Sequence, residues 1–275
     1  MILYHETHKY FYNKYYLPEK ENSVPEAVAS VFEHYLQEIP IAVYPTDILA
    51  GWYGYENSLP SEIQEGIRQY DDREQLKTAE YFMKLGCPDP YVLLSDIYLT
   101  HGAPYDRGHH MLDFRAVLNK GINSYIADVQ QRLQDETLSA QQRHYLLAMS
   151  RSLKATGIFS GRFATLAKEQ ADATTNEKDQ ERLQRIVDAC SRVPMEPATD
   201  IFEANQAIAL LWSLTAISEH TWCSISIGDF DQFMYPYYCI SKKKGISDHE
   251  MQMEMVSLFR ILDAYNGQDC TLSVG

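Results

Sequence analysis

The sequence lacks the features that would make it a membrane, secreted or nucleic-acid-binding protein. It has no apolar run of the roughly 20 residues needed to cross a bilayer. Its first residues, Met1 to His5, lack the basic and apolar regions of a secretory signal. Positive charge is scarce, because 24 Lys and Arg stand against 38 Asp and Glu, for a net charge of -14. Such an acidic surface repels phosphate backbones and anionic lipids, so we expect a cytoplasmic protein with no nucleic-acid and no membrane partner.

Cysteine chemistry is also thinly represented. The five cysteines are scattered and include no CxxC pair, so the pattern favours reduced thiols over disulfides or a zinc site. What the sequence does have is a globular composition, with 45% hydrophobic residues and 20 tyrosines among 275 residues. That length suits one large domain or two smaller ones with a sizeable core.

Helix signals recur along the chain. Ser23 and Glu26 form a capping-box pattern before apolar residues at helical spacing, and Pro40 ends that run. The segment 201–218 is apolar nearly all round, which is typical of a buried helix. Comparable signals predict helices near 73–85, from Asp113 through Val129, from Ser139 to about 170, from about 177 to near Cys190, and from Ser247 to about Tyr265.

Strand signals are few. Ile41–Tyr44 is a short apolar run stopped by Pro45, and Ser224–Ile227 alternates polar and apolar residues before Gly228. The stretch 101–110 is rich in histidine and glycine and is expected to be a loop. We therefore expect a fold that is mainly α with a minority of β.

Several motifs stand in a distinctive order. Arg192-Val193-Pro194 precedes the apolar helix, and the stretch from Ser224 to Tyr238 then holds a serine-rich strand, Phe-Asp-Gln and Tyr-Pro. Earlier come the segments Gly108–Phe114 and Val117–Gly121, and more loosely the run from Ile41 to Gly51. In this order they resemble the pyruvate formate-lyase-like domain of glycyl radical enzymes.

The resemblance implies a barrel of two half-sheets wrapped by helices. The chain is expected to hold the N-terminal part of that domain and to be incomplete at its C-terminus. Residues 1–100 would be peripheral helices and loops, and residues 101–275 would be helices and the first half-barrel strands. Nothing in the sequence matches the family's radical-bearing cysteine and glycine segments, so we expect no catalytic residue, cofactor or metal in this chain, and no activity of the chain alone.

The resemblance also implies the chemistry of the complete enzyme. A thiyl radical would cleave a C–C or C–heteroatom bond of a small polar organic substrate, as in pyruvate formate-lyase (formate acetyltransferase) or in the family's dehydratases and lyases. An activating enzyme with an iron–sulfur cluster and S-adenosylmethionine would install the glycyl radical, and we expect a homo-oligomer. Two alternatives remain: a non-catalytic binding or regulatory protein derived from this fold, and a helical protein of unrelated chemistry.

Five side chains are candidates for contact with substrate. The resemblance puts the region of His109 and His110 near the substrate chamber, although a loop role explains both histidines equally well. Ser224 and Ser226 share one face of the predicted strand, where they would bind either substrate or neighbouring backbone. Asp229 stands where the family usually has arginine, and its role is open.

Three neighbouring features bear on this assignment. His220-Thr221-Trp222-Cys223 replaces the family's asparagine-glycine-histidine before the strand, which, like Asp229, blocks a choice of substrate. Asp231 is interpreted as the cap of a short helix before Pro236. Cys223 is interpreted as a small buried residue rather than a catalytic thiol.

Overall fold

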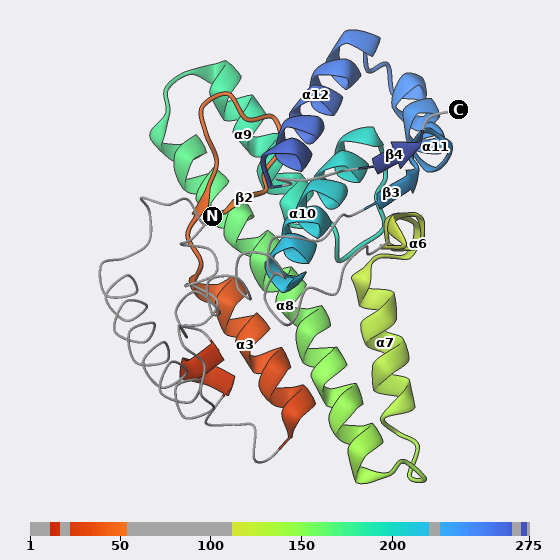
Figure 1. Ribbon diagram of the computed structural model, residues 1–275. Coiled ribbons are helices and arrows are strands. Elements are labelled where there is room, and N and C mark those ends of the chain that lie inside the picture. Colours follow the sequence, from red (N-terminus) through yellow and green to blue (C-terminus); the bar gives the residue numbers. More distant parts are fainter. Residues whose placement is uncertain (1–11, 17–22, 54–111, 220–225, 266–270, 274–275) are drawn as a thin grey trace, which may run out of the picture.

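The computed structural model describes residues 12–16, 23–53, 112–219, 226–265 and 271–273. Within these ranges the chain is mainly helical, with two small two-stranded sheets (Figure 1). This confirms the mainly α class, and none of the described helices is long and apolar enough to span a membrane. The elements are the π-helix η1 (Tyr12–Tyr16), α3 (Val24–Glu38), β1 (Ile41–Ala42), β2 (Trp52–Tyr53), α6 (Phe114–Lys120), α7 (Ile122–Arg132), α8 (Ala140–Ala173), α9 (Glu177–Cys190), α10 (Ile201–Glu219), β3 (Ser226–Asp229), α11 (Phe230–Lys243), α12 (Asp248–Tyr265) and β4 (Thr271–Ser273).

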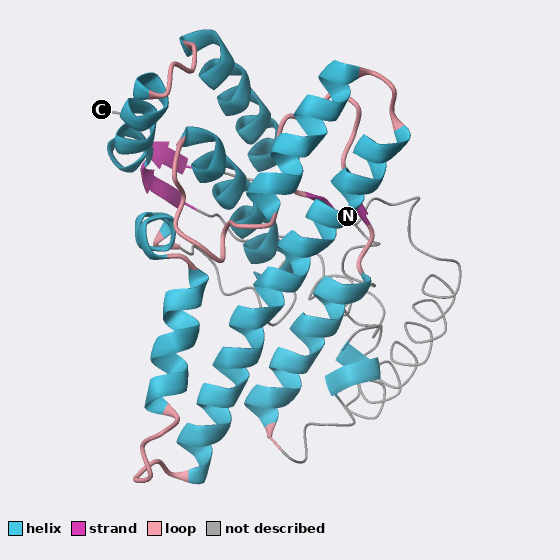
Figure 2. Ribbon diagram, turned by 180° about the vertical axis from the view of Figure 1, so that it is seen from behind, coloured by secondary structure: helices cyan, strands magenta, loops and turns pink. Residues whose placement is uncertain are grey.

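The 34-residue helix α8 is the long axis of the fold. It begins at a capping box in which Ser139 and Gln142 each satisfy the other's backbone N–H. Figures 1 and 2 show its first half lying between α3 and α7, and α9 packs against its second half. Arg162 of α8 donates to the carbonyls of Leu36 and Ile39 at 2.6 and 2.7 Å, so its cation satisfies the C-terminal end of α3.

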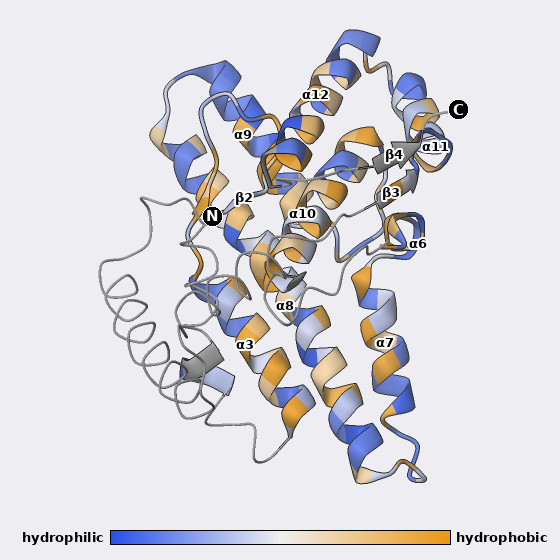
Figure 3. Ribbon diagram, in the orientation of Figure 1, coloured by the Kyte–Doolittle hydropathy of each residue, from blue (hydrophilic) through white to orange (hydrophobic). Residues whose placement is uncertain are grey.

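Helix α10 lies in the centre of the core, and Figure 3 shows apolar residues along much of its length. Its polar side chains bind a segment far away in sequence. Gln206 accepts from the Ala50 N–H at 2.9 Å and donates to the Ala50 carbonyl at 2.8 Å. Ser213 donates to the Gly51 carbonyl at 2.8 Å. These bonds hold the antiparallel β1–β2 pair against the buried helix.

The second sheet pairs β3 with β4 in parallel. Ser226 lies opposite Thr271, and Asp229 lies opposite Ser273. Helix α11 begins directly after β3, and α11 and α12 together supply most of the crossover that a parallel pair requires. Both strands of this second sheet therefore come from the last third of the chain, where the sequence motifs are most specific.

One helix that was predicted to be continuous is in fact two helices. The pattern from Asp113 to Val129 predicted a single helix, but the chain breaks at Gly121 into α6 and α7. Gly121 has φ 71° and ψ 157°, a conformation open almost only to glycine. The N–H groups of Ile122 and Asn123 turn instead to the carbonyls of Pro194 and Met195, both at 2.9 Å. A tertiary contact thus replaces the helical bonds.

Two further expectations need correction. Asp231 does not cap a short helix, because α11 starts at Phe230 and continues through Pro236 to Lys243. The predicted strand continues further than expected, since β3 ends at Asp229 and not at Gly228, while Ser224 and Ile225 lie outside the described residues. The helices predicted after Ser23, Ser139 and Ser247, and over 177–190 and 201–218, are confirmed. The predicted helix near 73–85 and the loop 101–110 lie outside the described residues.

Candidate functional site

The first candidate site is the end of strand β3. Ile227 is buried at 4% exposure, whereas Ser226 and Gly228 are half-buried and Asp229 is exposed. Because neighbouring residues of a strand point to opposite faces, Ser226 and the buried Ile227 face different sides of β3. Gly228 has φ 79°, a conformation that favours glycine and lets the chain turn from strand into helix.

Asp229 stands at the N-terminus of α11. Its side chain makes no capping hydrogen bond to the first turn, although a carboxylate is favourable at this end of a helix. The carboxylate is thus exposed beside the strand end rather than used up in a cap. Asp231 lies in the first turn of α11 and is half-buried.

Packing of α11 fixes this strand end. The Phe230 ring lies 5.6 Å from Phe233 and 5.9 Å from Phe259 of α12, centroid to centroid. Tyr237 donates its hydroxyl to Asn119 Oδ1 at 3.1 Å, which joins α11 to α6. Burial raises the pKa of Tyr237, so the phenol stays a donor at neutral pH. Two segments that carry the family motifs are thereby held together.

Only part of the predicted site is located. Ser226 and Asp229 lie at the two ends of β3, while His109, His110 and Ser224 lie outside the described residues, as does Cys223. Among the described residues no group of three or more His, Cys, Asp or Glu side chains is placed to hold a metal ion.

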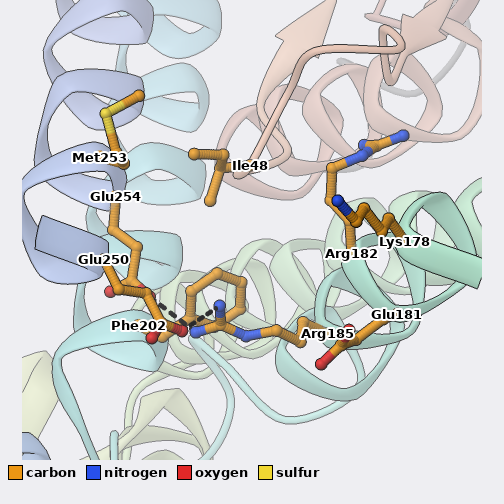
Figure 4. Close-up of a pocket in the computed structure, with 9 residues that line it drawn as sticks. All are labelled: Ile48, Lys178, Glu181, Arg182, Arg185, Phe202, Glu250, Met253 and Glu254. Carbon is orange, nitrogen blue, oxygen red and sulfur yellow. Dashed lines mark hydrogen bonds and ion pairs between the residues drawn. The ribbon is translucent and has the colours of Figure 1, made fainter. Parts of the chain in front are cut away.

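The second candidate site is a pocket of about 270 Å³ between α9, α10 and α12, which shares no lining residue with β3. Figure 4 shows Arg185 of α9 reaching across it. Arg185 donates from Nη1 to Glu250 at 2.9 Å and from Nη2 to Glu254 at 2.6 Å. Its guanidinium lies 4.1 Å from the centroid of the Phe202 ring. The pocket is lined by Ile48, Lys178, Glu181, Arg182, Arg185, Phe202, Glu250, Met253 and Glu254.

Glu254 is the unusual member of this pocket. It is 1% exposed, and burial raises the pKa of its carboxyl although the Arg185 guanidinium lowers it. Oε1 accepts from Arg185, and Oε2 has no hydrogen-bond partner among the residues that the structure describes. The sequence analysis did not find this residue. The signal was present, because Glu254 lies on the buried stripe of α12 with Met251, Leu258 and Ile261.

Comparison with known proteins defines the family. The family model for pyruvate formate lyase-like proteins matches residues 95–264, more than half of the chain. The chain belongs to this family, as the order of its motifs predicted.

Particular relatives are lyases and dehydratases. The chain is 27% identical over 193 residues to an isethionate sulfite-lyase of Desulfovibrio desulfuricans, covering 66% of this chain and 23% of that protein. It is 26% identical over 173 residues to a (2S)-3-sulfopropanediol dehydratase of Klebsiella oxytoca, covering 61% and 20%. The chain thus spans about a fifth to a quarter of the length of these relatives.

Solved structures show the same fold. A glycyl radical enzyme from Archaeoglobus fulgidus aligns with a TM-score of 0.74 at 18% identity, over 98% of this chain and 38% of that one. The B12-independent glycerol dehydratase from Clostridium butyricum aligns with a TM-score of 0.71 at 20% identity, over 98% and 40%. The described helices and strands are therefore arranged as in part of a glycyl radical enzyme.

Proposed function

We propose that this chain forms the N-terminal part of a glycyl radical enzyme, with the helical shell and the first strands of its barrel. The observation that carries the proposal is the family match from 95 to 264, which runs through α6 to α11 and across β3. The parallel β3–β4 pair supports it, because parallel strands belong to larger sheets covered by helices. Residues 1–100 would then be peripheral, and residues 101–275 would carry the first half-barrel strands.

The complete enzyme would cleave a C–C or C–heteroatom bond of a small polar organic substrate. A glycyl radical, installed by an activating enzyme with an iron–sulfur cluster and S-adenosylmethionine, would supply the thiyl radical that starts the reaction. This chain would contribute binding and exclusion of water rather than the radical. Ser224, Ser226 and one of the two histidines, His109 or His110, would donate hydrogen bonds to the substrate. Asp229 would face substrate as an acceptor.

An electron paramagnetic resonance experiment tests the proposal. The complete reading frame that contains this chain is expressed without oxygen, together with its activating enzyme. We expect a glycyl radical signal from the complete protein and none from residues 1–275 alone. A radical-free complete protein that still binds a small ligand would favour the non-catalytic binding protein instead, and would sink the proposal.

The role of the strand is tested separately. Ser226→Ala in the complete enzyme removes one hydroxyl and leaves the buried Ile227 in place. If Ser226 binds substrate, turnover falls by about 10- to 100-fold, the cost of about one to two hydrogen bonds, while the radical signal is unchanged. Thr165→Ala is the matched control, because the hydroxyl of Thr165 binds only the Gly161 carbonyl within α8. Equal activity of the two variants would remove Ser226 from the site.

A further inference from the structure

We propose that the pocket between α9 and α12 binds a small zwitterion, whose ammonium group contacts Glu254 and whose carboxylate contacts Lys178. This site is separate from β3 and does not depend on the proposed function. The pocket joins elements that are far apart in sequence, since Arg185 and Glu254 are 69 residues apart.

The first step is the unsatisfied carboxylate of Glu254. Its side chain is 1% exposed and lines the pocket, and Oε2 lacks a donor within the described part of the chain, although Oε1 binds Arg185 at 2.6 Å. A buried carboxylate oxygen without a donor is costly, so this position calls for a ligand atom that donates a hydrogen bond.

The second step is the charge of that ligand atom. Glu250 and Glu254 share the single guanidinium of Arg185, and Asp200 adds further negative potential at Glu254. Arg185 is already held by both carboxylates and by the Phe202 ring 4.1 Å away. The missing donor is therefore cationic, and an ammonium group supplies both the charge and the hydrogen bond.

The third step is the opposite wall, where α9 contributes positive charge. Lys178 lines the pocket, and its ammonium has no acceptor among the described residues. Arg182 adds a second cation: its Nη1 donates to the Asp47 carbonyl at 2.6 Å, and its Nε, which has no hydrogen bond among the described residues, lies 3.6 Å from Asp179 Oδ1. Glu181 is the single acid that α9 places in the lining. This wall suits a carboxylate.

The positive and negative charges of the pocket lining are equal in number, which favours a zwitterion over a ligand with a net charge. The lining holds three basic residues, all on α9, and three acids, of which Glu181 is on α9 and the other two are on α12. The two walls are thus polarised, but the lining as a whole is neutral. A volume of about 270 Å³ is small beside the ~300–1,000 Å³ of pockets for drug-sized ligands, so the ligand is small. Ile48, Met253 and Phe202 would contact its aliphatic part (Figure 4).

Calorimetric titration of the 275-residue chain with three matched probes tests the inference. The probes are 5-aminopentanoate, pentylammonium and pentanoate, which carry both charges, the cation alone and the anion alone. We expect 5-aminopentanoate to bind at least ~10-fold more tightly than either of the others. Pentanoate binding as tightly as 5-aminopentanoate, or no binding of the zwitterion at ~10 mM, would overturn the proposal.

Variants then assign the two ends of the ligand. Glu254→Gln and Lys178→Met should each weaken 5-aminopentanoate binding by ~10-fold or more, and the exposed Lys178 keeps the test informative if Glu254→Gln does not fold. Glu136→Gln and Lys243→Met are controls at exposed positions outside the pocket, and should leave binding unchanged. If the Lys178→Met variant instead binds pentylammonium more tightly than the parent does, then the Lys178 ammonium itself pairs with Glu254 in solution. That result would overturn the proposed zwitterion site.

Discussion

Gly121 is the position where the fold is expected to tolerate a methyl group least. Its backbone has φ 71° and ψ 157°, and a Cβ built there lies 2.4 Å from the Met195 carbonyl oxygen and 2.7 Å from the Glu196 carbonyl carbon. Both neighbours are backbone atoms, so no side-chain rotation relieves the contact. Gly121→Ala must therefore move the 194–196 segment or the α6–α7 junction.

The magnitude follows from terms of known size. The glycine-only conformation costs an alanine about 1–3 kcal/mol, and forcing an extra carbon into a packed site costs about 1–3 kcal/mol more. If the segment moves, the hydrogen bonds from Ile122 and Asn123 to the Pro194 and Met195 carbonyls also weaken, at about 1 kcal/mol each. We expect Gly121→Ala to lower the free energy of unfolding by about 3–5 kcal/mol, out of a typical 5–15 kcal/mol.

Urea unfolding followed by circular dichroism measures this loss. Gly161→Ala in α8 is the matched control, because a Cβ at Gly161 meets nothing within 4 Å. This control should gain about 0.5–1 kcal/mol, since alanine favours the helix over glycine. A Gly121→Ala protein within about 0.5 kcal/mol of the parent would refute the close approach of the two segments.

Three other perturbations test different parts of the structure. Arg162→Met removes two hydrogen bonds to the end of α3 and should cost about 2–4 kcal/mol in the same urea assay, with only partial recovery in Arg162→Lys. Asn205 is fully buried, and neither its amide nitrogen nor its amide oxygen has a hydrogen bond among the described residues. Asn205→Leu should therefore raise the free energy of unfolding by about 1 kcal/mol, and a thermal shift downward would contradict this. Burial raises the pKa of Glu254 and of Asp47, so their protonated forms favour the folded state. The stability that they add is present below the unfolded-state pKa and is lost as pH rises through the folded-state pKa. The urea midpoint should accordingly rise as the pH is lowered through the folded-state pKa of these carboxyls, and should rise less in Glu254→Gln.

Sequence patterns correctly predicted those helices whose ends are set by residues close by in the sequence. Ser139 caps α8 through Gln142, and Ser23 caps α3, as their spacing indicated. The break at Gly121 was missed because its cause is a tertiary contact with Met195, which no local pattern records. Helix α11 likewise continues past Pro236, although proline in a helix removes a backbone hydrogen bond and usually ends the run.

The two candidate sites also differ in whether local sequence or tertiary packing forms them. Ser226 was predicted from alternation along a few residues, which is a local property, and its role at the substrate stays a prediction. The pocket was not predicted, because Arg185, Glu250 and Glu254 meet only when α9 packs across α10 toward α12. An acid on an otherwise apolar stripe of α12 was the available signal, since such a residue needs a partner or a ligand.

The helices and the β3–β4 pair differ in how far contacts within the described structure stabilise them. Helices α3, α8, α9, α10 and α12 contribute to one continuous buried core, so they hold together through their own contacts. The β3–β4 pair is a two-stranded parallel sheet, a form that ordinarily needs neighbouring strands and helical cover on both faces. In β3, Ile227 is buried while Asp229 is exposed. The helices are therefore the scaffold, and, under the proposed function, the strand pair is where further strands of the barrel would add stability.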